Sequence, residues 1–401
     1  STYAIRVQAK DEFNATVEGN FTVTLTDWFD GIWNKVTAPD RSALEQFGKS
    51  VSKSGNLLAV GAQLAVTDGV ETGAVYLYRM EVDGSSTFLS KVTAPDKAFG
   101  NQFGFSVSLS SDLLIVGSYL SDPSGISDAG ASYLYRVESN GSATFLNKIM
   151  APDQASGDYF GRAVSISGNL IGVGAHTADP NGVTNGGSVY LYRLESNGSL
   201  SFLNKVIAHD ISAEDEFGVD LSLYDNLLSI GSRKADPNGF TNGGAAYLYR
   251  VEQNGSVSLL EKIVANDIAA NDWFGRDVSQ YGNFTFVGAS SSDPGGVHDA
   301  GAAYLYRLES NDSLSFLGKV FAYDGTPTSY FGTSVSQFGD TLAVGARNAH
   351  ANGVVDTGAV YLYQIEDNGS ISFLSKITAP DSATGDTFAS SISLSENQLV
   401  V

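Results

Sequence analysis

The chain of 401 residues contains no cysteine, only 9 prolines, and only 23 lysines and arginines against 44 aspartates and glutamates. The lack of cysteine excludes a disulfide scaffold and a thiolate metal site. The formal net charge of −21 argues against nucleic acid or an anionic membrane surface as a partner, because both attract a basic protein. No hydrophobic run approaches the roughly 20 residues that cross a bilayer as a helix, so we expect no membrane span.

What the chain has in abundance is repetition. The segment FGRAVSISGNLIGVGA at 160–175 returns with small changes, and the last copy is shortened. The other copies begin at Phe47, Phe103, Phe217, Phe274, Phe331 and Phe388. Successive phenylalanines are 56 residues apart once and 57 apart thereafter. A fixed period of this length indicates a repeat architecture, so it is interpreted before any local feature.

Each repeat predicts one blade of four antiparallel strands. In the copy from Phe160, four stretches alternate polar and apolar residues, and Gly, Asn and Asp separate them. An isolated small sheet leaves its faces and edges exposed, whereas sheets stacked around an axis bury both faces. No stretch shows apolar residues at helical spacing. We therefore predict an all-β, seven-bladed β-propeller of four-stranded antiparallel blades, with a period of about 57 residues and almost no helix.

The repeats resemble the FG-GAP repeats of integrin α-subunit propellers and their bacterial relatives. The resemblance rests on Phe-Gly, on Val-Gly-Ala at 60–62, 173–175, 287–289 and 344–346, and on GAVYLY or a variant, and it covers roughly residues 33–401. It implies a propeller of a secreted, adhesin-type surface protein. Two departures limit it, because no proline follows Val-Gly-Ala and tight turns replace the family's Asp-rich calcium loop. The family's metal sites are therefore not carried over.

Two interpretations of the chain ends are open. The last repeat stops after its second strand, while GNFTVTLTD at 19–27 reads as a third strand and WNKVTAPD at 33–40 as a fourth. In the first interpretation, 1–20 is an N-terminal segment and 21–401 is the seven-bladed propeller, with 21–40 completing the last blade. In the second, the start is the cadherin-like end of another module, and the chain was cut from a larger adhesin. Both place it in an extracellular, multi-domain protein.

Acidic residues gather in two long loops of each repeat, which we expect on one face of the propeller. The loop from the fourth strand to the next first strand carries an APD-x4-D pattern, and the loop from the second to the third carries Asp-Pro-Asn-Gly. The candidate metal ligands are Asp153, Asp158, Asp210, Asp215, Asp267, Asp272, Asp381, Asp386, Asp179 and Asp236. Their oxygens suit Ca²⁺, the one cofactor that the sequence indicates. The competing interpretation is ordinary turn chemistry, since no Asp-x-Asp-x-Asp alternation is present.

Two further patterns concern aromatic and histidine residues. A recurring pair of tyrosines in the third strand predicts packing between blades rather than a carbohydrate platform. These residues are Tyr76, Tyr78, Tyr133, Tyr135, Tyr190, Tyr192, Tyr247, Tyr249, Tyr304, Tyr306, Tyr361 and Tyr363. The four histidines, His176, His209, His298 and His350, share no register, and no Ser/His/Asp set can be nominated. We therefore predict that the chain is not an enzyme.

These patterns together predict a binding or adhesion module at the cell surface or outside the cell. It would use the acidic long-loop face to engage a protein or glycan on a cell surface or matrix, with calcium as a possible aid. The alternative is a structural subunit of an extracellular fibre or surface assembly that self-assembles through its terminal strands.

Overall fold

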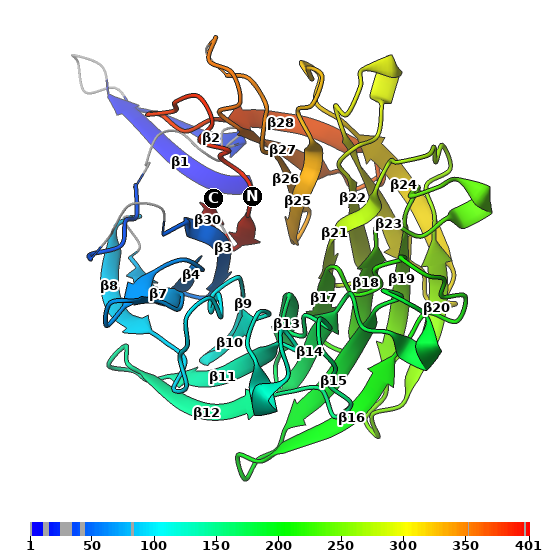
Figure 1. Ribbon diagram of the computed structural model, residues 1–401. Helices are drawn as coiled ribbons and strands as arrows, with labels where there is room; N and C mark the ends of the chain where they lie inside the picture. The colour runs from blue at the N-terminus through cyan, green and yellow to red at the C-terminus, as the bar shows by residue number, and fades with distance from the viewer. Residues whose placement is uncertain are drawn as a thin grey trace. The chain divides into compact units, whose positions relative to one another are not determined.

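The computed structural model describes residues 2–10, 16–24, 34–40, 45–81, 84–351, 353–396 and 398–401. Contacts within the chain divide it into two units, Ser1–Asn34 and Lys35–Val401. In the first unit, β1 (Thr2–Lys10) and β2 (Thr16–Thr24) pair as an antiparallel hairpin. The second unit is a ring of β-sheets around a central axis (Figure 1).

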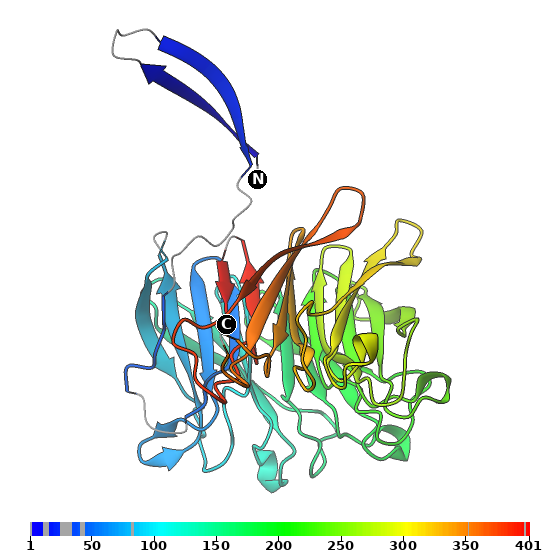
Figure 2. The same ribbon diagram turned by 90° about the horizontal axis from the view of Figure 1, so that it is seen from above.

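Six repeats of the second unit each form a four-stranded antiparallel blade, with the strands in chain order from the axis outward (Figures 1 and 2). The first blade consists of β3 (Phe47–Ser54), β4 (Leu57–Ala62), β7 (Ala74–Met80) and β8 (Ser86–Val92), with a small hairpin of β5 (Val66–Thr67) and β6 (Val70–Glu71) between β4 and β7. The second consists of β9 (Ser106–Ser110), β10 (Leu113–Ser118), β11 (Ala131–Val137) and β12 (Ala143–Ile149). The third consists of β13 (Ala163–Ser167), β14 (Leu170–Ala175), β15 (Ser188–Leu194) and β16 (Leu200–Val206).

The remaining three blades repeat this order. The fourth consists of β17 (Leu221–Tyr224), β18 (Leu227–Ser232), β19 (Ala245–Val251) and β20 (Val257–Ile263). The fifth consists of β21 (Phe274–Tyr281), β22 (Phe284–Ala289), β23 (Ala302–Leu308) and β24 (Leu314–Val320). The sixth consists of β25 (Phe331–Phe338), β26 (Thr341–Ala346), β27 (Ala359–Ile365) and β28 (Ile371–Ile377).

Helix is almost absent from the described residues, as predicted. The helical elements there are four single 3-10 turns, each between the second and third strands of a blade. They are η1 (Pro123–Gly125), η2 (Pro180–Gly182), η3 (Pro237–Gly239) and η4 (Pro294–Gly296). None of the helices in the described ranges is long and apolar enough to cross a membrane.

The all-β propeller is confirmed, but the prediction of seven four-stranded blades is wrong. The described residues form six such blades, and the last repeat contributes only the two-stranded sheet of β29 (Ser393–Ser395) and β30 (Gln398–Val400). The error came from counting Phe-Gly pairs, because each pair marks an innermost strand and does not require three more strands after it. Completion of the last blade by 21–40 stays a prediction, since 25–33 lies outside the described residues.

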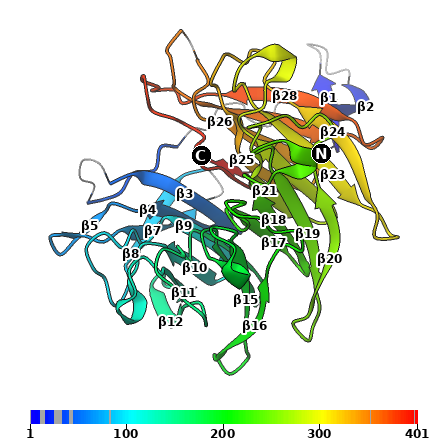
Figure 3. The ribbon, with the colours of Figure 1, turned by 45° about the vertical axis from the view of Figure 1, so that its right-hand side comes forward.

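Serine hydroxyls join the innermost strands of neighbouring repeats around the axis. One serine of each innermost strand accepts a hydrogen bond, 2.9–3.2 Å long, from a backbone N–H of the next innermost strand. The acceptors are Ser52, Ser108, Ser165, Ser222, Ser279, Ser336 and Ser393. The last bond joins β29 to β3, so the shortened repeat completes the inner ring (Figure 3).

The repeated glycines are explained by the close approach of neighbouring blades. A Cβ on Gly117, in β10, would lie 1.9 Å from the carbonyl oxygen of Gly161, the glycine of the next Phe-Gly pair. The partner of that glycine, Phe160, is fully buried and packs edge-on against Tyr190 with ring centres 5.4 Å apart. The core therefore lies between blades, where it buries both sheet faces.

Candidate functional site

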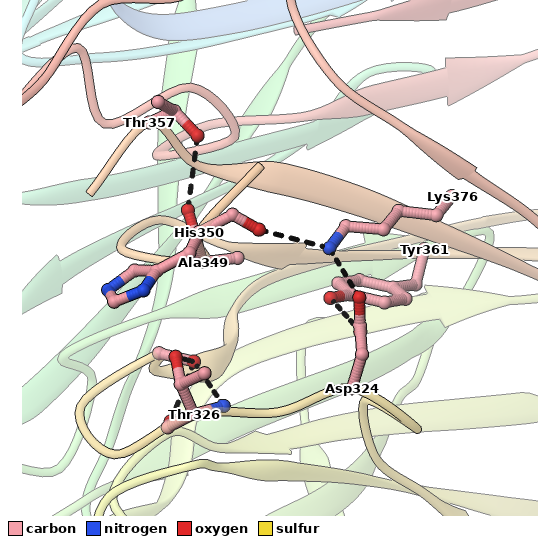
Figure 4. Close-up of polar contacts among 8 residues, drawn as sticks. Asp324, Thr326, Ala349, His350, Thr357, Tyr361 and Lys376 are labelled. Atoms are coloured by element: carbon pink, nitrogen blue, oxygen red, sulfur yellow. Dashed lines mark hydrogen bonds and ion pairs between the residues drawn. The ribbon is translucent and has the colours of Figure 1, made fainter. Parts of the chain in front are cut away.

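The aspartates that follow the fourth strands bind the next blade. The carboxylate of Asp153 accepts hydrogen bonds from the Tyr190 hydroxyl at 2.9 Å and from the Lys205 ammonium at 2.6 Å. This triad occurs six times, and Figure 4 shows it for Asp324. Its aspartates are Asp40, Asp96, Asp153, Asp210, Asp267 and Asp324.

The tyrosines of these triads lie between blades, as predicted. The inner tyrosine of each pair, such as Tyr190, is no more than 1% exposed, and its hydroxyl reaches the preceding blade. Burial raises the pKa of the Asp153 carboxyl, but the bonds from Lys205 and Tyr190 outweigh it and hold the pKa below its usual value. These aspartates therefore serve as ionised links between blades.

The other predicted metal ligands also have partners within the chain. Four accept a hydrogen bond, 2.6–2.8 Å long, from the backbone N–H three residues earlier: Asp158, Asp215, Asp272 and Asp386. Asp179 and Asp236 accept from backbone N–H groups of their own loops, and Asp381 pairs with Lys35. The described residues contain no group of three or more His, Cys, Asp and Glu side chains placed to hold a metal. Calcium binding stays a prediction.

A different set of side chains surrounds the axis on the long-loop face. Bridges such as Gly130 to Phe160 place the ends of both long loops together, as expected. The innermost strand begins at this face and the second strand ends there, so three positions of each repeat adjoin the axis. They are the residue before Phe-Gly, the residue after it, and the residue after the Gly-Ala or Gly-Ser that ends the second strand.

We call the residues at these three positions the axial cluster. Before Phe-Gly or its equivalent stand Gln46, Gln102, Tyr159, Glu216, Trp273, Tyr330 and Thr387. After it stand Lys49, Phe105, Arg162, Val219, Arg276, Thr333 and Ser390. After the second strand stand Gln63, Tyr119, His176, Arg233, Ser290 and Arg347.

The backbone before each Phe-Gly pair adopts a left-handed conformation. The φ angle there is 51–55° in all seven repeats, even where the residue is Tyr159, Trp273 or Tyr330. Bulky residues rarely adopt this conformation, which costs on the order of 1 kcal/mol per residue. A backbone hydrogen bond holds the turn, as from the N–H of Arg162 to the carbonyl of Tyr159 at 3.2 Å.

Cations and aromatic rings alternate within the axial cluster. Lys49 and Arg162 lie over Phe105 at 4.7 and 5.0 Å from the ring centre, Arg233 and Arg276 lie near Trp273 at 5.6 and 5.8 Å, and Arg347 lies over Tyr330 at 4.9 Å. Contacts of this kind orient a guanidinium without neutralising it.

Most of these cations have no anionic partner. Glu216 pairs with Arg233 at 2.7 Å and with Lys234 at 2.6 Å, so it neutralises one side of the cluster. Elsewhere in the cluster, no carboxylate of the described residues forms a hydrogen bond or ion pair with the cations. The four without such a partner are Lys49, Arg162, Arg276 and Arg347.

Buried nitrogen atoms of the cluster also lack acceptors. Nε of Arg162, Nε of Arg347 and Nδ1 of His176 are buried and have no hydrogen-bond partner in the described structure. Leaving buried polar atoms unpaired costs free energy, so most such atoms in folded proteins are satisfied. The Nε–H groups of Arg162 and Arg347 are donors, so an added acceptor would satisfy them.

The unpaired cations repel one another across the ring. Desolvation, followed by repulsion from Arg233, Arg347 and Arg162, lowers the pKa of Arg276 to about 10. Desolvation and repulsion from Arg162, Arg276 and Arg347 also lower the pKa of Lys49. These side chains come from the first, third, fifth and sixth repeats, so they face a common space. Burial also lowers the pKa of His176 to about 3, which keeps that imidazole neutral near pH 7.

Two carboxylates lie one residue further along the innermost strands. Asp220 accepts a hydrogen bond from the backbone N–H of Val278 at 2.8 Å, and Asp277 accepts one from Val335 at 2.7 Å. Burial raises the pKa of Asp220 to about 6. Burial and the nearby Asp220 raise the pKa of Asp277 well above its usual value. The axial cluster thus borders a carboxylate pair that can hold a proton.

The features that the repeats share do not reveal the axial cluster. The informative positions are those at which near-identical repeats differ. After Phe-Gly or its equivalent, successive repeats carry Lys, Phe, Arg, Val, Arg, Thr and Ser. His176, which shares no register with the other histidines, belongs to one of these positions.

Comparison with solved structures supports the propeller. The chain is similar to the periplasmic gluconolactonase of Pseudomonas aeruginosa, with a TM-score of 0.54 and 16% identity, over 96% of this chain and 98% of the other. It is also similar to a protein from Lactobacillus plantarum, with a TM-score of 0.52 and 13% identity, over 94% and 93% of the two chains. At these identities the similarity shows the fold alone. Sequence comparison with curated proteins gives no significant match.

The prediction that the chain is not an enzyme is contradicted by this comparison. A propeller that matches it over almost the whole of both chains is a gluconolactonase by name. That prediction rested on histidines that share no register and on the lack of a Ser/His/Asp set. It overlooked the varied residues of the axial cluster.

The family is shown by the repeats themselves. The FG-GAP repeat matches residues 33–78, 87–135, 144–192, 201–249, 257–306, 315–363 and 372–401. The five segments between 87 and 363 each begin in the fourth strand of one blade and end in the third strand of the next, so each of these spans the contact between two blades. The chain belongs to the FG-GAP repeat family.

Proposed function

We propose that this chain is a binding module that takes an anionic ligand at the axial cluster. The observation that carries the proposal is the set of four cations, Lys49, Arg162, Arg276 and Arg347, which lie against aromatic rings of the axial cluster and form no ion pair with a carboxylate of the described residues. The net charge of the chain is −21, so this gathering of unpaired cations departs from the overall composition. Guanidinium groups bind carboxylate, sulfate and phosphate oxygens through two parallel hydrogen bonds.

The proposal moves the binding site from the acidic loops to the axis of the same face. The loop aspartates have partners in the chain, as Asp153 has in Lys205 and Tyr190, so they are less available to a ligand. The acidic loops then act as a rim that disfavours anions away from the axis. Half-buried aromatic rings such as Tyr159 and Trp273 add apolar surface for the rest of the ligand.

The setting that we propose is extracellular, in a surface or adhesin-type protein with a cadherin-like start. Support comes from the family's occurrence in such proteins, as implied by the resemblance of the repeats. An anionic glycan or an acidic protein segment on a cell surface would then be the partner. The alternative role, a fibre subunit joined through terminal strands, predicts concentration-dependent polymers in electron micrographs.

Calcium binding by the long loops is a separate proposal. Calorimetric titration with calcium, together with thermal melts in EDTA and in calcium, tests it. Saturable heat and a higher melting temperature would support metal sites at the predicted aspartates. Their absence would leave these residues as turn and inter-blade acceptors.

A second candidate function is hydrolysis of a sugar lactone at the same site. The observation that favours it is the carboxylate pair Asp220 and Asp277 beside Arg276. One carboxylate would take a proton from the attacking water, a guanidinium would stabilise the oxyanion, and a protonated carboxyl would give its proton to the leaving oxygen. The gluconolactonase named above acts on such a lactone. The rate of gluconolactone hydrolysis is measured by the uptake of alkali. A rate no faster than in buffer would refute this candidate.

The binding proposal is tested by titrating the chain with anionic oligosaccharides while following tryptophan fluorescence. Trp273 is the tryptophan of the axial cluster, so a ligand beside Arg276 should change its emission. Arg276→Gln should weaken binding at least tenfold. Arg193→Gln is the matched control. Arg193 lies opposite Leu170 in the register of β14 and β15, at the end of the blade away from the axial cluster. Equal affinity in the two variants would contradict the proposed site.

A further inference from the structure

The carboxylate pair beside the axial cluster is not required for the contact between blades. Asp220 and Asp277 each accept a backbone N–H of the next innermost strand. At the same position of the last repeat, Ser391 accepts the N–H of Val51 at 3.1 Å. A neutral hydroxyl therefore makes the same link. The two carboxylates occur in neighbouring repeats, which brings two like charges together at a cost that a serine would avoid.

The pair and the cations share one environment. Arg276 directly precedes Asp277, and the charge of Arg162 also acts on Asp220. Two charged groups face the pair from the neighbouring strands: Arg162, just before β13, and Arg276, within β21. The neutral donors that face it are the backbone N–H groups of Val278 and Val335. Lys49, Arg233 and Arg347 act on these arginines from the other repeats. His176 is neutral and does not titrate here near pH 7.

The number and arrangement of the cations define the ligand's charge. A monoanion would neutralise one of four unpaired cations and leave the other three repelling one another. A compact group with two or more negative charges can approach cations from opposite sides of the ring at once, because Lys49 comes from the first repeat, Arg162 from the third and Arg276 from the fifth. Such a group also brings negative charge close to Asp220 and Asp277, which favours their protonated forms.

We propose that the axial cluster and the Asp220–Asp277 pair form one site that takes a compact, multiply charged oxyanion together with a proton. The inference rests on the proposed function and adds the ligand's charge class and the proton. By linkage, a bound anion that raises the proton affinity of the pair is itself bound more tightly at lower pH. The effect is present between the pKa of the free pair and that of the bound pair, and it approaches tenfold in affinity per pH unit for one proton.

The experiment is a calorimetric titration of the full chain with methanedisulfonate, a dianion that does not itself titrate near neutral pH. Methanesulfonate serves as the monoanion at the same ionic strength. Titrations near pH 7 in two buffers of different ionisation enthalpy give the number of protons taken up. We expect methanedisulfonate to bind at least tenfold more tightly than methanesulfonate, with proton uptake and with affinity that rises from about pH 8 to about pH 6.

The double variant Asp220→Asn, Asp277→Asn tests proton uptake separately from anion binding. Asparagine can still accept the N–H groups of Val278 and Val335, and an unchanged circular dichroism spectrum checks that the ring is intact. We expect the variant to bind the dianion without proton uptake. Dianion binding without uptake in the unmodified chain, or equal uptake in the variant, would overturn the inference and leave the proposed anion site standing. Binding of neither sulfonate would overturn both.

Discussion

The hydroxyl of Ser393 accepts a hydrogen bond from the backbone N–H of Lys53 at 3.1 Å, across 340 positions of the chain. This bond repeats, at the junction between the last and first repeats, the link that every other pair of neighbouring innermost strands makes. The ring is therefore continuous around the axis, which gives the axial cluster a fixed frame. Residues from repeats far apart in sequence can then form one site.

Ser393→Ala should lower the free energy of unfolding by about 1–2 kcal/mol, because the N–H of Lys53 loses its acceptor. Chemical denaturation measures the change. Ser258→Ala is the control, since Ser258 is exposed on β20. Equal stability of the two variants would show that the hydroxyl does not contribute to closure.

Gly117→Ala should destabilise the chain by about 3 kcal/mol or more, because a Cβ there would lie 1.9 Å from the backbone oxygen of Gly161. Gly318→Ala provides a comparison, since its Cβ would meet only the side-chain tip of Ile371 at 3.0 Å. Thermal melts of both variants measure the difference. A small effect at Gly117 would mean that the blades can separate to admit a methyl group.

Stability should fall on acidification below about pH 4, the ordinary pKa of an aspartate. The pKa of Asp153 is lowered in the folded chain, so the stability that this group contributes is present above the unfolded-state pKa and is lost as the pH falls through the folded-state pKa. Asp153→Asn should reduce both the stability at neutral pH, by about 1 kcal/mol or less, and its acid dependence. Asp367→Asn, at an exposed turn, should change neither. An acid profile unchanged by Asp153→Asn would contradict the role given to the triads.

Arg276→Gln should stabilise the chain in anion-poor buffer, by on the order of 1 kcal/mol, because it removes one of four mutually repelling cations. The same variant should lose the stabilisation that a bound anion gives to the unmodified chain. Melting temperatures with and without methanedisulfonate measure both effects. A variant that is less stable in anion-poor buffer would mean that the contact of Arg276 with Trp273 outweighs the repulsion.

The fold could be predicted from the repeats, because each repeat by itself contains the strand alternation and the glycines that form a blade. The packing of Phe160 on Tyr190 and the close approach at Gly117 recur in each repeat, so one repeat explains the others. The blade count was not predictable from Phe-Gly pairs, because β29 and β30 complete the inner ring, and no outer strands join them among the described residues. The axial cluster depends on which side chains of different repeats lie together, as Lys49 and Arg162 both lie over Phe105. No single repeat contains that information.

A crystal structure determined with selenate present would show whether the axial cluster binds an anion. Selenate carries two charges, and its selenium gives anomalous signal that marks its position. We expect a peak on the axis within hydrogen-bonding distance of Arg162 and Arg276, and we expect it to be lost in crystals of Arg276→Gln. Peaks only on the outer surface, with none at the axis, would show that the axial cluster is not an anion site.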